Sequence, residues 1–301
     1  MPLDIDRPAP LADPRVGVAM AVTAAVAFSF KAILVKLALL VGAVPVPLLT
    51  MRMLLAAPFF VALLVWRRSP GPAPTRREVG ALLVLGLLGF YVSAVLDFLG
   101  LQHLTAGLER IVLYAHPTFV VLLAAAWARE APSSRALAAI GVAWIGLAVA
   151  AIADLRAIPA HDLAIGVGMV LGAALFYAMY LLGVQRLGAT HGNLRVASAA
   201  NLVATAALAG HSAALHRDDL AAATPYLWGL ALLMAVVSTV LPHLLLASAI
   251  GRIGPARAST LGMVGPVAAS LLGWMLLGEP LSLLQLVGGA LVVAGVSLAR
   301  S

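Results

Sequence analysis

The chain has 301 residues, of which 63% are hydrophobic and only 10% are charged. Because a soluble domain has roughly a quarter charged residues, this composition excludes a water-exposed surface and predicts a protein that crosses a membrane several times. The net charge is +7 and cysteine is absent, which excludes disulfide bonds, thiolate catalysis and cysteine metal sites. Basic residues in short loops orient a membrane protein, so the positive balance does not indicate a nucleic-acid partner.

Ten apolar segments are predicted as membrane spans, since each is close to the roughly 20 residues that cross a bilayer. In chain order, the first five are Val16–Val41, Val46–Trp66, Val79–Leu99, Leu104–Trp127 and Ala136–Ala153. The next five are Leu163–Leu182, Leu194–Leu215, Pro225–Ile250, Pro255–Leu277 and Leu281–Leu298. The first span is interpreted as retained, because its apolar run is too long for a typical cleaved signal. The predicted fold class is therefore an all-α integral membrane protein with ten transmembrane helices.

Positive charge is distributed unevenly between the two ends of these spans. Thirteen arginines fall on one side, namely Arg7, Arg15, Arg67, Arg68, Arg76, Arg77, Arg129, Arg135, Arg186, Arg195, Arg252, Arg257 and Arg300. The opposite side has only Arg156 and Arg217. The positive-inside tendency then predicts a multi-pass protein of the inner (plasma) membrane with both termini in the cytoplasm.

The chain repeats itself at an offset of 149 residues. The residues that recur in the same context are Pro117, Glu130, Ser133, Leu137 and Gly146, matched by Pro266, Glu279, Ser282, Leu286 and Gly295. We therefore predict two five-helix repeats, residues 1–153 and residues 154–301. Because five is odd, the second repeat must enter the bilayer upside down. Inverted repeats of this kind share a pocket near the midplane of the membrane, as expected of a carrier that uses alternating access.

The doubled pattern also resembles a known family. The residues that carry the resemblance are Pro117, Trp127, Glu130, Gly141 and Gly146, echoed by Pro266, Gly278-Glu279-Pro280, Gly288-Gly289 and Gly295, together with Asp97-Phe98-Leu99-Gly100-Leu101 and Ala106-Gly107. They are similar to the EamA-type repeats of the drug/metabolite transporter (DMT) superfamily over nearly the whole chain. The resemblance implies a ten-helix carrier whose central cavity is lined mainly by helices 1, 3, 4, 6, 8 and 9. Members of that family mostly export amino acids and other small metabolites.

Two prolines interrupt the predicted spans near their centres. Pro117 and Pro266 each lack a backbone N–H and free the carbonyl four residues earlier, that of Leu113 and that of Gly262. In hydrocarbon such a carbonyl needs another partner, from protein or from water in a cavity. Two midplane breaks related by an inverted repeat therefore favour a neighbouring pocket over a simple packing kink.

Both lysines of the protein, Lys31 and Lys36, lie in the first span. A cation near the middle of a bilayer costs roughly 2.5–3.5 kcal/mol, so each is a functional hypothesis. At about 100° per residue the two side chains point about 140° apart, so one pocket is not lined equally by both. Lys31, which shares a helix face with Phe28, is predicted to reach the substrate pocket. Lys36 lies closer to the outer surface, where a lysine can extend to the headgroups.

Four further charged residues, Arg52, Asp97, Glu109 and Arg110, are predicted to lie with Lys36 in the outer half of the first repeat. In one interpretation, Asp97 or Glu109 titrates beside a basic partner and couples solute binding to proton release. In the other, the group forms static ion pairs that satisfy polar groups in lipid. Excess positive charge would also suit a carboxylate on the substrate. The repeat offset aligns Arg52 with Asn201, so this charge has no symmetric counterpart.

Several polar or aromatic side chains could bind an amphipathic or ring-bearing solute by hydrogen bonding and stacking. They are Tyr114, His116, Tyr177, Tyr180 and His243, with Phe28 on the face of Lys31. Each of them could equally be a packed residue with one hydrogen bond. Glu130 and Glu279 precede a proline and a serine at the ends of spans, and they are interpreted as structural residues at helix ends.

The predicted function is that of a secondary carrier, and most simply an exporter, of a small metabolite such as an amino acid. The alternatives are a passive facilitator, a non-transporting membrane scaffold or lipid-handling protein, and a membrane-embedded enzyme. The enzyme is disfavoured because the chain has neither a His-Glu-x-x-His nor a Gly-x-Ser-x-Gly motif. No cofactor or metal is expected, and no phosphate-binding loop supports ATP-driven transport. The expected partners are the solute and the lipid bilayer, with both a monomer and a homodimer left open.

Overall fold

The computed structural model describes residues 14–66, 74–155 and 158–300. Within these ranges the chain is helical and contains no strand. Arg7, Arg67, Arg68 and Arg156, which enter the charge count above, lie outside the described residues.

The helices of the first repeat form one group in chain order. They are α1 (Pro14–Leu40), α2 (Pro45–Trp66), α3 (Arg76–Gly86), the π-helical turn η1 (Leu87–Val92), α4 (Ser93–Gly100), α5 (Ala106–Leu113), α6 (His116–Ala128) and α7 (Ser134–Asp154). Those of the second repeat are α8 (Ala160–His191), α9 (Asn193–Leu215), α10 (Arg217–Ala221), α11 (Pro225–Ala235), the π-helical turn η2 (Val236–Val240), α12 (Leu241–Gly262), α13 (Gly265–Leu277) and α14 (Leu283–Arg300).

The repeat found in the sequence is also a repeat of structure. Shifted by 149 residues, the bounds of α3 become those of α11, the bounds of α6 become those of α13, and η1 begins where η2 begins. The residue after α6, Arg129, and the residue after α13, Gly278, both adopt the left-handed conformation, with φ of 57° and 67°. Such a residue ends a helix by turning the chain away from it.

Matching side chains start the matching helices. Thr75 and Thr224 accept hydrogen bonds from backbone N–H groups in the first turns of α3 and α11. Ser133 and Ser282 do the same at the starts of α7 and α14. A threonine or serine at this position satisfies a backbone donor that has no partner within the helix. Helix-end capping beside Glu130 and Glu279, predicted from the sequence, is thus confirmed for the two serines.

Seven helical segments in the described part of the chain are long and apolar enough to cross a membrane. They are Pro14–Leu40, Pro45–Val65, Arg76–Gly100, Ala106–Ala128, Ser134–Asp154, Ala160–His191 and Pro225–Ile250. The apolar helices Gly265–Leu277 and Leu283–Leu298 are shorter. The ninth predicted span is shortened because the chain breaks before Gly265. The seventh predicted span, which corresponds to α9, is not among the seven segments, and it carries polar residues such as Asn201 and His211.

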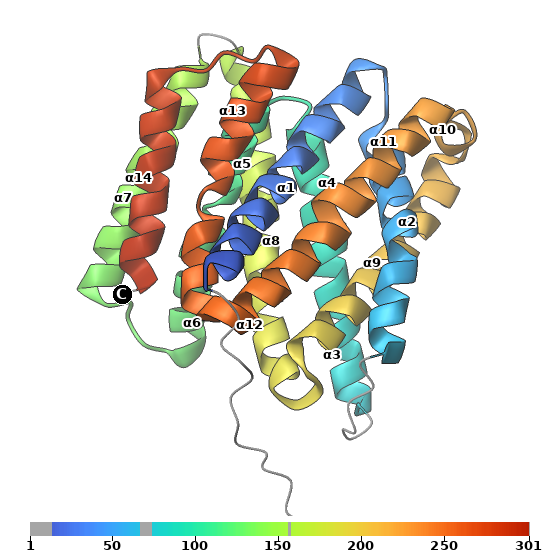
Figure 1. Ribbon diagram of the computed structural model, residues 1–301, viewed down its shortest axis with the longest axis horizontal. Helices are drawn as coiled ribbons and strands as arrows, with labels where there is room; N and C mark the ends of the chain where they lie inside the picture. The colour runs from blue at the N-terminus through green and yellow to red at the C-terminus, as the bar shows by residue number, and fades with distance from the viewer. Residues whose placement is uncertain (1–13, 67–73, 156–157, 301) are drawn as a thin grey trace, which may run out of the picture.

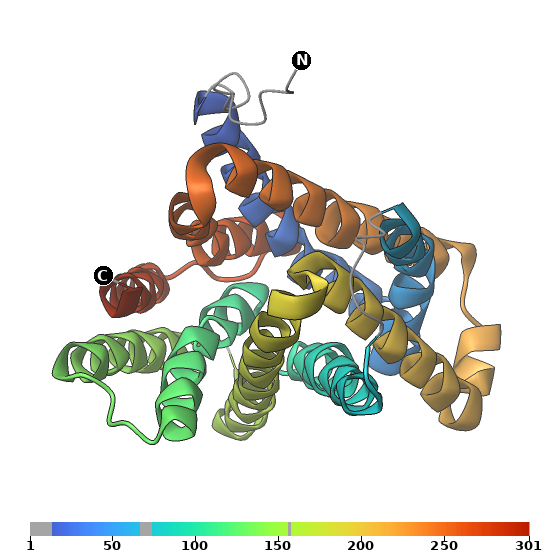
Figure 2. The same cartoon turned by 90° about the horizontal axis from the view of Figure 1, so that it is seen from below.

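Equivalent segments of the two repeats run in opposite directions. In Figure 1 the chain rises from α3 to α4, whereas it descends from α11 to α12. The most extensive packing joins the repeats to each other, as between α1 and α12, α2 and α9, α4 and α8, and α7 and α14. The main core lies where α1, α2 and α4 meet α9 and α11. The repeats are therefore interlocked, and Figure 2 shows α7 beside α14 at one side of the molecule and α9 at the other.

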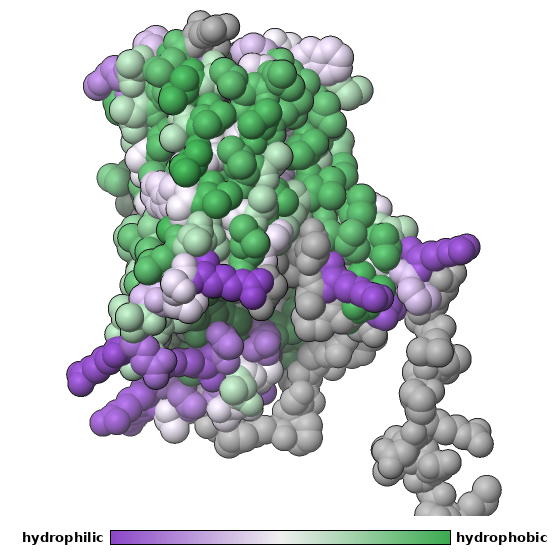
Figure 3. Space-filling view, turned by 90° about the vertical axis from the view of Figure 1, so that its left-hand side faces the viewer, coloured by the Kyte–Doolittle hydropathy of each residue, from purple (hydrophilic) through white to green (hydrophobic). Residues whose placement is uncertain are grey.

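Apolar side chains cover most of the outer surface formed by α7 and α14. In Figure 3 this face is hydrophobic over its upper part, and hydrophilic residues gather at its lower end. Exposed large side chains on these helices include Leu137, Trp144, Ile145, Ile152 and Val287. A contiguous apolar band of this size is typical of a surface that faces lipid.

The α7–α14 pair packs backbone against backbone at glycine. A Cβ atom on Gly288 would lie 2.5 Å from the carbonyl oxygen of Gly146, and a Cβ on Gly295 would lie 2.6 Å from that of Ala139. Glycine permits this approach because it has no side chain. Gly141, which lies on α7 like Gly146, has open space around it.

We expect Gly288→Val to lower the thermal stability of the purified protein, by about 1–3 kcal/mol of unfolding free energy, because the larger side chain must push two backbones apart. Gly141→Ala is the matched control on the partner helix. It should leave stability unchanged or raise it by about 0.5–1 kcal/mol, because alanine has the better helix propensity. Thermal unfolding followed by tryptophan fluorescence compares the two. Equal effects of both substitutions would contradict the close contact.

Candidate functional site

A cavity of about 450 Å³ lies between the two repeats. The first repeat lines it from α1, α2, η1, α4, α5 and α6, and the second lines it from α8, η2, α12 and α14. Of the predicted substrate-binding residues, the lining contains Phe28, Lys31, Tyr114, His116, Tyr177 and His243. It also contains Arg52, Asp97, Arg110 and Pro117. The cavity volume falls within the range of pockets that hold small molecules.

Tyr180 does not line the cavity, contrary to its predicted role. Its side chain is only 4% exposed and stacks behind Tyr177, with ring centroids 5.7 Å apart. A Cβ on Gly89 would collide with the Tyr180 ring, so the ring fills the space next to η1. The two tyrosines lie three residues apart and share a face of α8, but Tyr180 packs against η1 while Tyr177 reaches the cavity.

The two predicted helix breaks border this cavity. Helix α5 ends at Leu113 and α6 begins at His116, while α12 ends at Gly262 and α13 begins at Gly265. Pro117 and Pro266 occupy the first turns of α6 and α13, where a missing N–H costs little. Pro117 lines the cavity, whereas Pro266 is buried in the packing beside it.

The carbonyls that the prolines free have protein partners, as predicted. Nδ1 of His116 lies 3.0 Å from the Leu113 oxygen, and because a carbonyl only accepts, Nδ1 carries the proton. The Tyr114 hydroxyl donates to the Gly262 oxygen at 2.5 Å. Tyr114 thus links the break in the first repeat to the break in the second, and both partners are residues that line the cavity.

We expect Tyr114→Phe to destabilise the protein by about 1–3 kcal/mol, because it leaves the Gly262 carbonyl without its hydrogen bond. The phenylalanine keeps the ring and its packing. Tyr226→Phe on the 55% exposed Tyr226 is the matched control and should not change the melting temperature. Thermal unfolding in detergent measures both, and an unchanged melting temperature for Tyr114→Phe would show that the hydrogen bond contributes no stability.

Lys31 forms ion pairs with two carboxylates. Its Nζ lies 2.5 Å from Oδ2 of Asp97 and 3.1 Å from Oε1 of Glu109. The three side chains are 10%, 8% and 0% exposed. In a low-dielectric interior such charges persist only when paired. One lysine therefore neutralises part of the charge of both acids, which come from α4 and α5.

The two arginines that line the cavity, Arg52 and Arg110, make different contacts. Arg52 donates from Nε to the Thr239 hydroxyl at 3.0 Å, and its guanidinium lies 5.7 Å from the centre of the Phe98 ring. The Arg110 guanidinium lies 5.9 Å from the centre of the Tyr114 ring. Nε of Arg110 is buried and has no hydrogen-bond partner among the described residues.

The structure separates Lys36 from this group. Its Nζ lies 3.9 Å from Oε1 of Glu279, in the turn between α13 and α14. Both carboxylate oxygens of Glu279 accept from the backbone N–H of Ala106, at 3.1 and 2.8 Å. Glu279 of the second repeat therefore caps the first turn of α5 in the first repeat, where the helix dipole favours negative charge. We call Lys36, Glu279 and the first turn of α5 the upper contact.

Burial raises the pKa of the Glu279 carboxyl above its usual range, and the neighbouring Lys36 and backbone N–H groups oppose that rise. Further hydrogen bonds surround the upper contact. Thr105 donates to Asp154 at 2.6 Å and accepts from Gln285 at 3.4 Å. Glu130, the residue of the first repeat that matches Glu279, is by contrast exposed.

Aromatic and hydroxyl groups that the sequence did not single out complete the site. Phe90 and Ser93 come from η1 and α4, and Ser238 comes from η2. The rings of Phe28 and His243 meet edge to face at 5.3 Å, as do those of His116 and Tyr177. No local sequence pattern marks a π-helical turn, so Phe90 and Ser238 had no signal beyond their place in the repeat. In the described residues, no group of three or more His, Asp and Glu side chains is placed to hold a metal ion.

These features define a membrane transporter, and comparison with known proteins gives its family. The model of the EamA-like transporter family matches residues 15–152 and again residues 164–301. The chain belongs to this family, and it is a multi-pass membrane transporter of the drug/metabolite transporter superfamily.

The chain is also similar to one protein in sequence and to one solved structure in fold. The relative is the uncharacterized transporter YcbK of Bacillus subtilis (strain 168), which is 32% identical over 268 residues, covering 87% of this chain and 86% of YcbK. The solved structure is a crystal structure of 18% sequence identity that covers 94% of this chain and 96% of its own, with a TM-score of 0.61. At that identity it supports the fold alone.

Proposed function

We propose that the protein is a secondary carrier that moves a small metabolite out of the cell by alternating access. In this proposal ten spans form two inverted repeats, residues 1–153 and 154–301, with both termini in the cytoplasm. The observation that carries it is the cavity between the repeats, which both repeats line and which the two broken helices border. Cavities at an inverted-repeat interface beside discontinuous helices are typical of such carriers.

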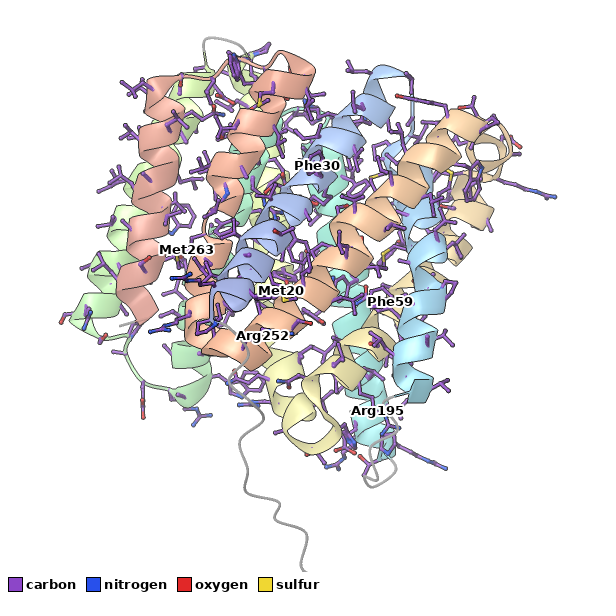
Figure 4. All side chains as sticks on the ribbon, viewed as in Figure 1. Met20, Phe30, Phe59, Arg195, Arg252 and Met263 are labelled. Atoms are coloured by element: carbon purple, nitrogen blue, oxygen red, sulfur yellow. The ribbon has the colours of Figure 1, made fainter. Side chains whose placement is uncertain are left out.

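The shape of the cavity supports a state that is closed on one side. Along α1 the lining includes Ala21, Ala24, Phe28 and Lys31 but no residue beyond Lys31. The cavity therefore extends toward the end where α1 begins, and Figure 4 shows Met20 and Arg252 near that lower end of the α1–α12 pair. At the other end, the upper contact ties α1, α5 and the α13–α14 turn together. In the proposed topology, this structure is open toward the cytoplasm and closed outside.

The absence of native cysteine makes the topology directly testable. Single cysteines replace Ala131, before α7, and the exposed Leu283, at the start of α14. We expect a membrane-impermeant maleimide to label Leu283→Cys in intact cells and Ala131→Cys only in inverted vesicles. Labelling of both positions from the same side would refute the inverted arrangement.

Transport itself is tested in proteoliposomes with a panel of small metabolites, amino acids among them. At least one solute should move faster than in empty vesicles, and a proton gradient should accelerate it if the Lys31 group couples the two fluxes. Transport that ignores the gradient would identify a passive facilitator. If no solute of any charge moves faster than in empty vesicles, the carrier proposal fails.

A further inference from the structure

The charged side chains around the cavity do not balance. Lys31, Arg52 and Arg110 face Asp97 and Glu109, which leaves one positive charge in excess. Both acids already bind Lys31. Neither arginine has a carboxylate partner within salt-bridge distance among the described residues, so two guanidinium groups stand beside the cavity without a counter-ion.

The repeat shows that the fold does not require these charges. Shifted by 149 residues, the five positions are occupied by Tyr180, Asn201, Leu246, Ala258 and Ser259, none of which is charged. The second repeat is helical at all five positions without them, although α12 runs unbroken where the first repeat has α4 and α5. Because charge inside a membrane protein is costly, charge confined to one repeat points to what occupies the cavity rather than to what holds the helices.

Among the described residues, the two arginines have donors for which no protein partner is recorded. Nε of Arg110 is buried without a partner, and its guanidinium lies against the Tyr114 ring. Arg52 uses Nε on Thr239, which leaves its terminal donors for a ligand. A guanidinium matches a carboxylate with two parallel hydrogen bonds, and binding one removes the cost of the unsatisfied donor.

We infer that Arg110 and Arg52 bind the solute and that the solute is a small organic anion with one carboxylate and a ring-bearing body. This inference rests on the proposed carrier function. A single negative charge cancels the excess charge of the site. An apolar and aromatic surface for the ring is supplied by the lining residues Phe28, Phe90, Tyr177 and His243. An amine would have to compete with Lys31 for Asp97 and Glu109, whose remaining oxygens are buried.

Three ligands that share a phenyl ring and a short chain test the charge preference. They are 3-phenylpropionate, an anion; phenylalanine, which adds an ammonium group; and 2-phenylethylamine, which keeps the ammonium and lacks the carboxylate. Binding to the purified full-length protein is measured by the shift of its melting temperature with ligand concentration. We expect 3-phenylpropionate to bind, phenylalanine to bind at least about tenfold more weakly because its ammonium must compete with Lys31 for the two acids, and the amine not to bind.

Substitutions assign the binding to the arginines. Arg110→Gln and Arg52→Gln should each weaken 3-phenylpropionate binding by about tenfold or more, and Arg110→Lys should recover only part of that loss because it lacks the fork of donors. Arg186→Gln is the matched control, since the exposed Arg186 stacks on Trp127 at 3.2 Å outside the cavity. Circular dichroism and elution as a single species verify that each variant is folded.

The outcomes separate this inference from the carrier proposal. Wild-type binding by both glutamine variants would overturn the inference, as would stronger binding of phenylalanine or the amine, or no binding of 3-phenylpropionate. In each case the carrier proposal stands if proteoliposomes transport a solute of another charge class. If they transport none, both fail together.

Discussion

Lys31→Met is expected to destabilise the protein by about 3–5 kcal/mol, because it leaves two buried carboxylates facing each other without their shared cation. Asp97 and Glu109 both lie within 3.1 Å of Lys31 Nζ and are almost inaccessible. Methionine keeps the length and packing of the side chain, so the loss reports the charge. Solute transport should fall to the level of empty vesicles, since the cavity lining changes shape and charge together.

Thermal unfolding of the purified variant measures this effect, with Lys36→Met as the matched control on the same helix. Lys36 is 22% exposed and 3.9 Å from its partner, so its loss should cost only about 0–1 kcal/mol. The triple variant Lys31→Met, Asp97→Asn, Glu109→Gln removes the charges together and should regain most of the stability without regaining transport. A Lys31→Met protein as stable as the Lys36→Met protein would mean that the acids do not depend on Lys31.

Cross-linking the upper contact is expected to abolish transport. If alternating access operates, Lys36 must separate from Glu279 when the site opens outward, since the two side chains join the repeats at that end. Lys36→Cys and Glu279→Cys are introduced together into the cysteine-free chain. A bifunctional thiosulfonate reagent, whose bridge compensates for the shorter side chains, then connects the two sulfurs.

Transport by the cross-linked fraction should fall to the background of empty vesicles, and a reducing agent should restore it. The two single-cysteine variants, treated with the same reagent, separate cross-linking from simple modification. They also measure what the lost cap on α5 costs by itself. Full transport by a quantitatively cross-linked protein would exclude opening at this end.

Much of the fold was predictable because a repeat carries information twice. The offset of 149 residues placed the breaks at Pro117 and Pro266, and the structure ends and restarts helices there. The need of the freed carbonyls for partners was also predictable from the chemistry of proline. The number of spans is less direct. Ala106–Ala128 qualifies as a span despite its break, whereas the break before Gly265 leaves α13 too short to qualify.

The site was predictable to the extent that helix faces determine it. Phe28 and Lys31 share a face of α1 and both reach the cavity. Contacts between segments far apart in the sequence were not predictable. The sequence grouped Lys36 with Arg52 by depth, yet its partner is Glu279, 243 residues away. Depth along one span says nothing about which helix of the other repeat packs against it. Tyr180 was misplaced for a related reason: its helix was expected to line the cavity, but the element that covers its ring, η1, was not predictable.

The glycine contact between α7 and α14 limits which helices of the transporter can move relative to each other. Two helices whose backbones are in contact cannot slide or rotate against each other without steric clashes between their backbone atoms. We therefore expect α7 and α14 to keep their relative position, and any rearrangement that opens the cavity to be a movement of the other helices relative to this pair. Substitutions at the glycine contacts of this pair, but not at the cavity-lining Val296 of α14, should alter how much protein a cell accumulates while the choice of solute stays as it was.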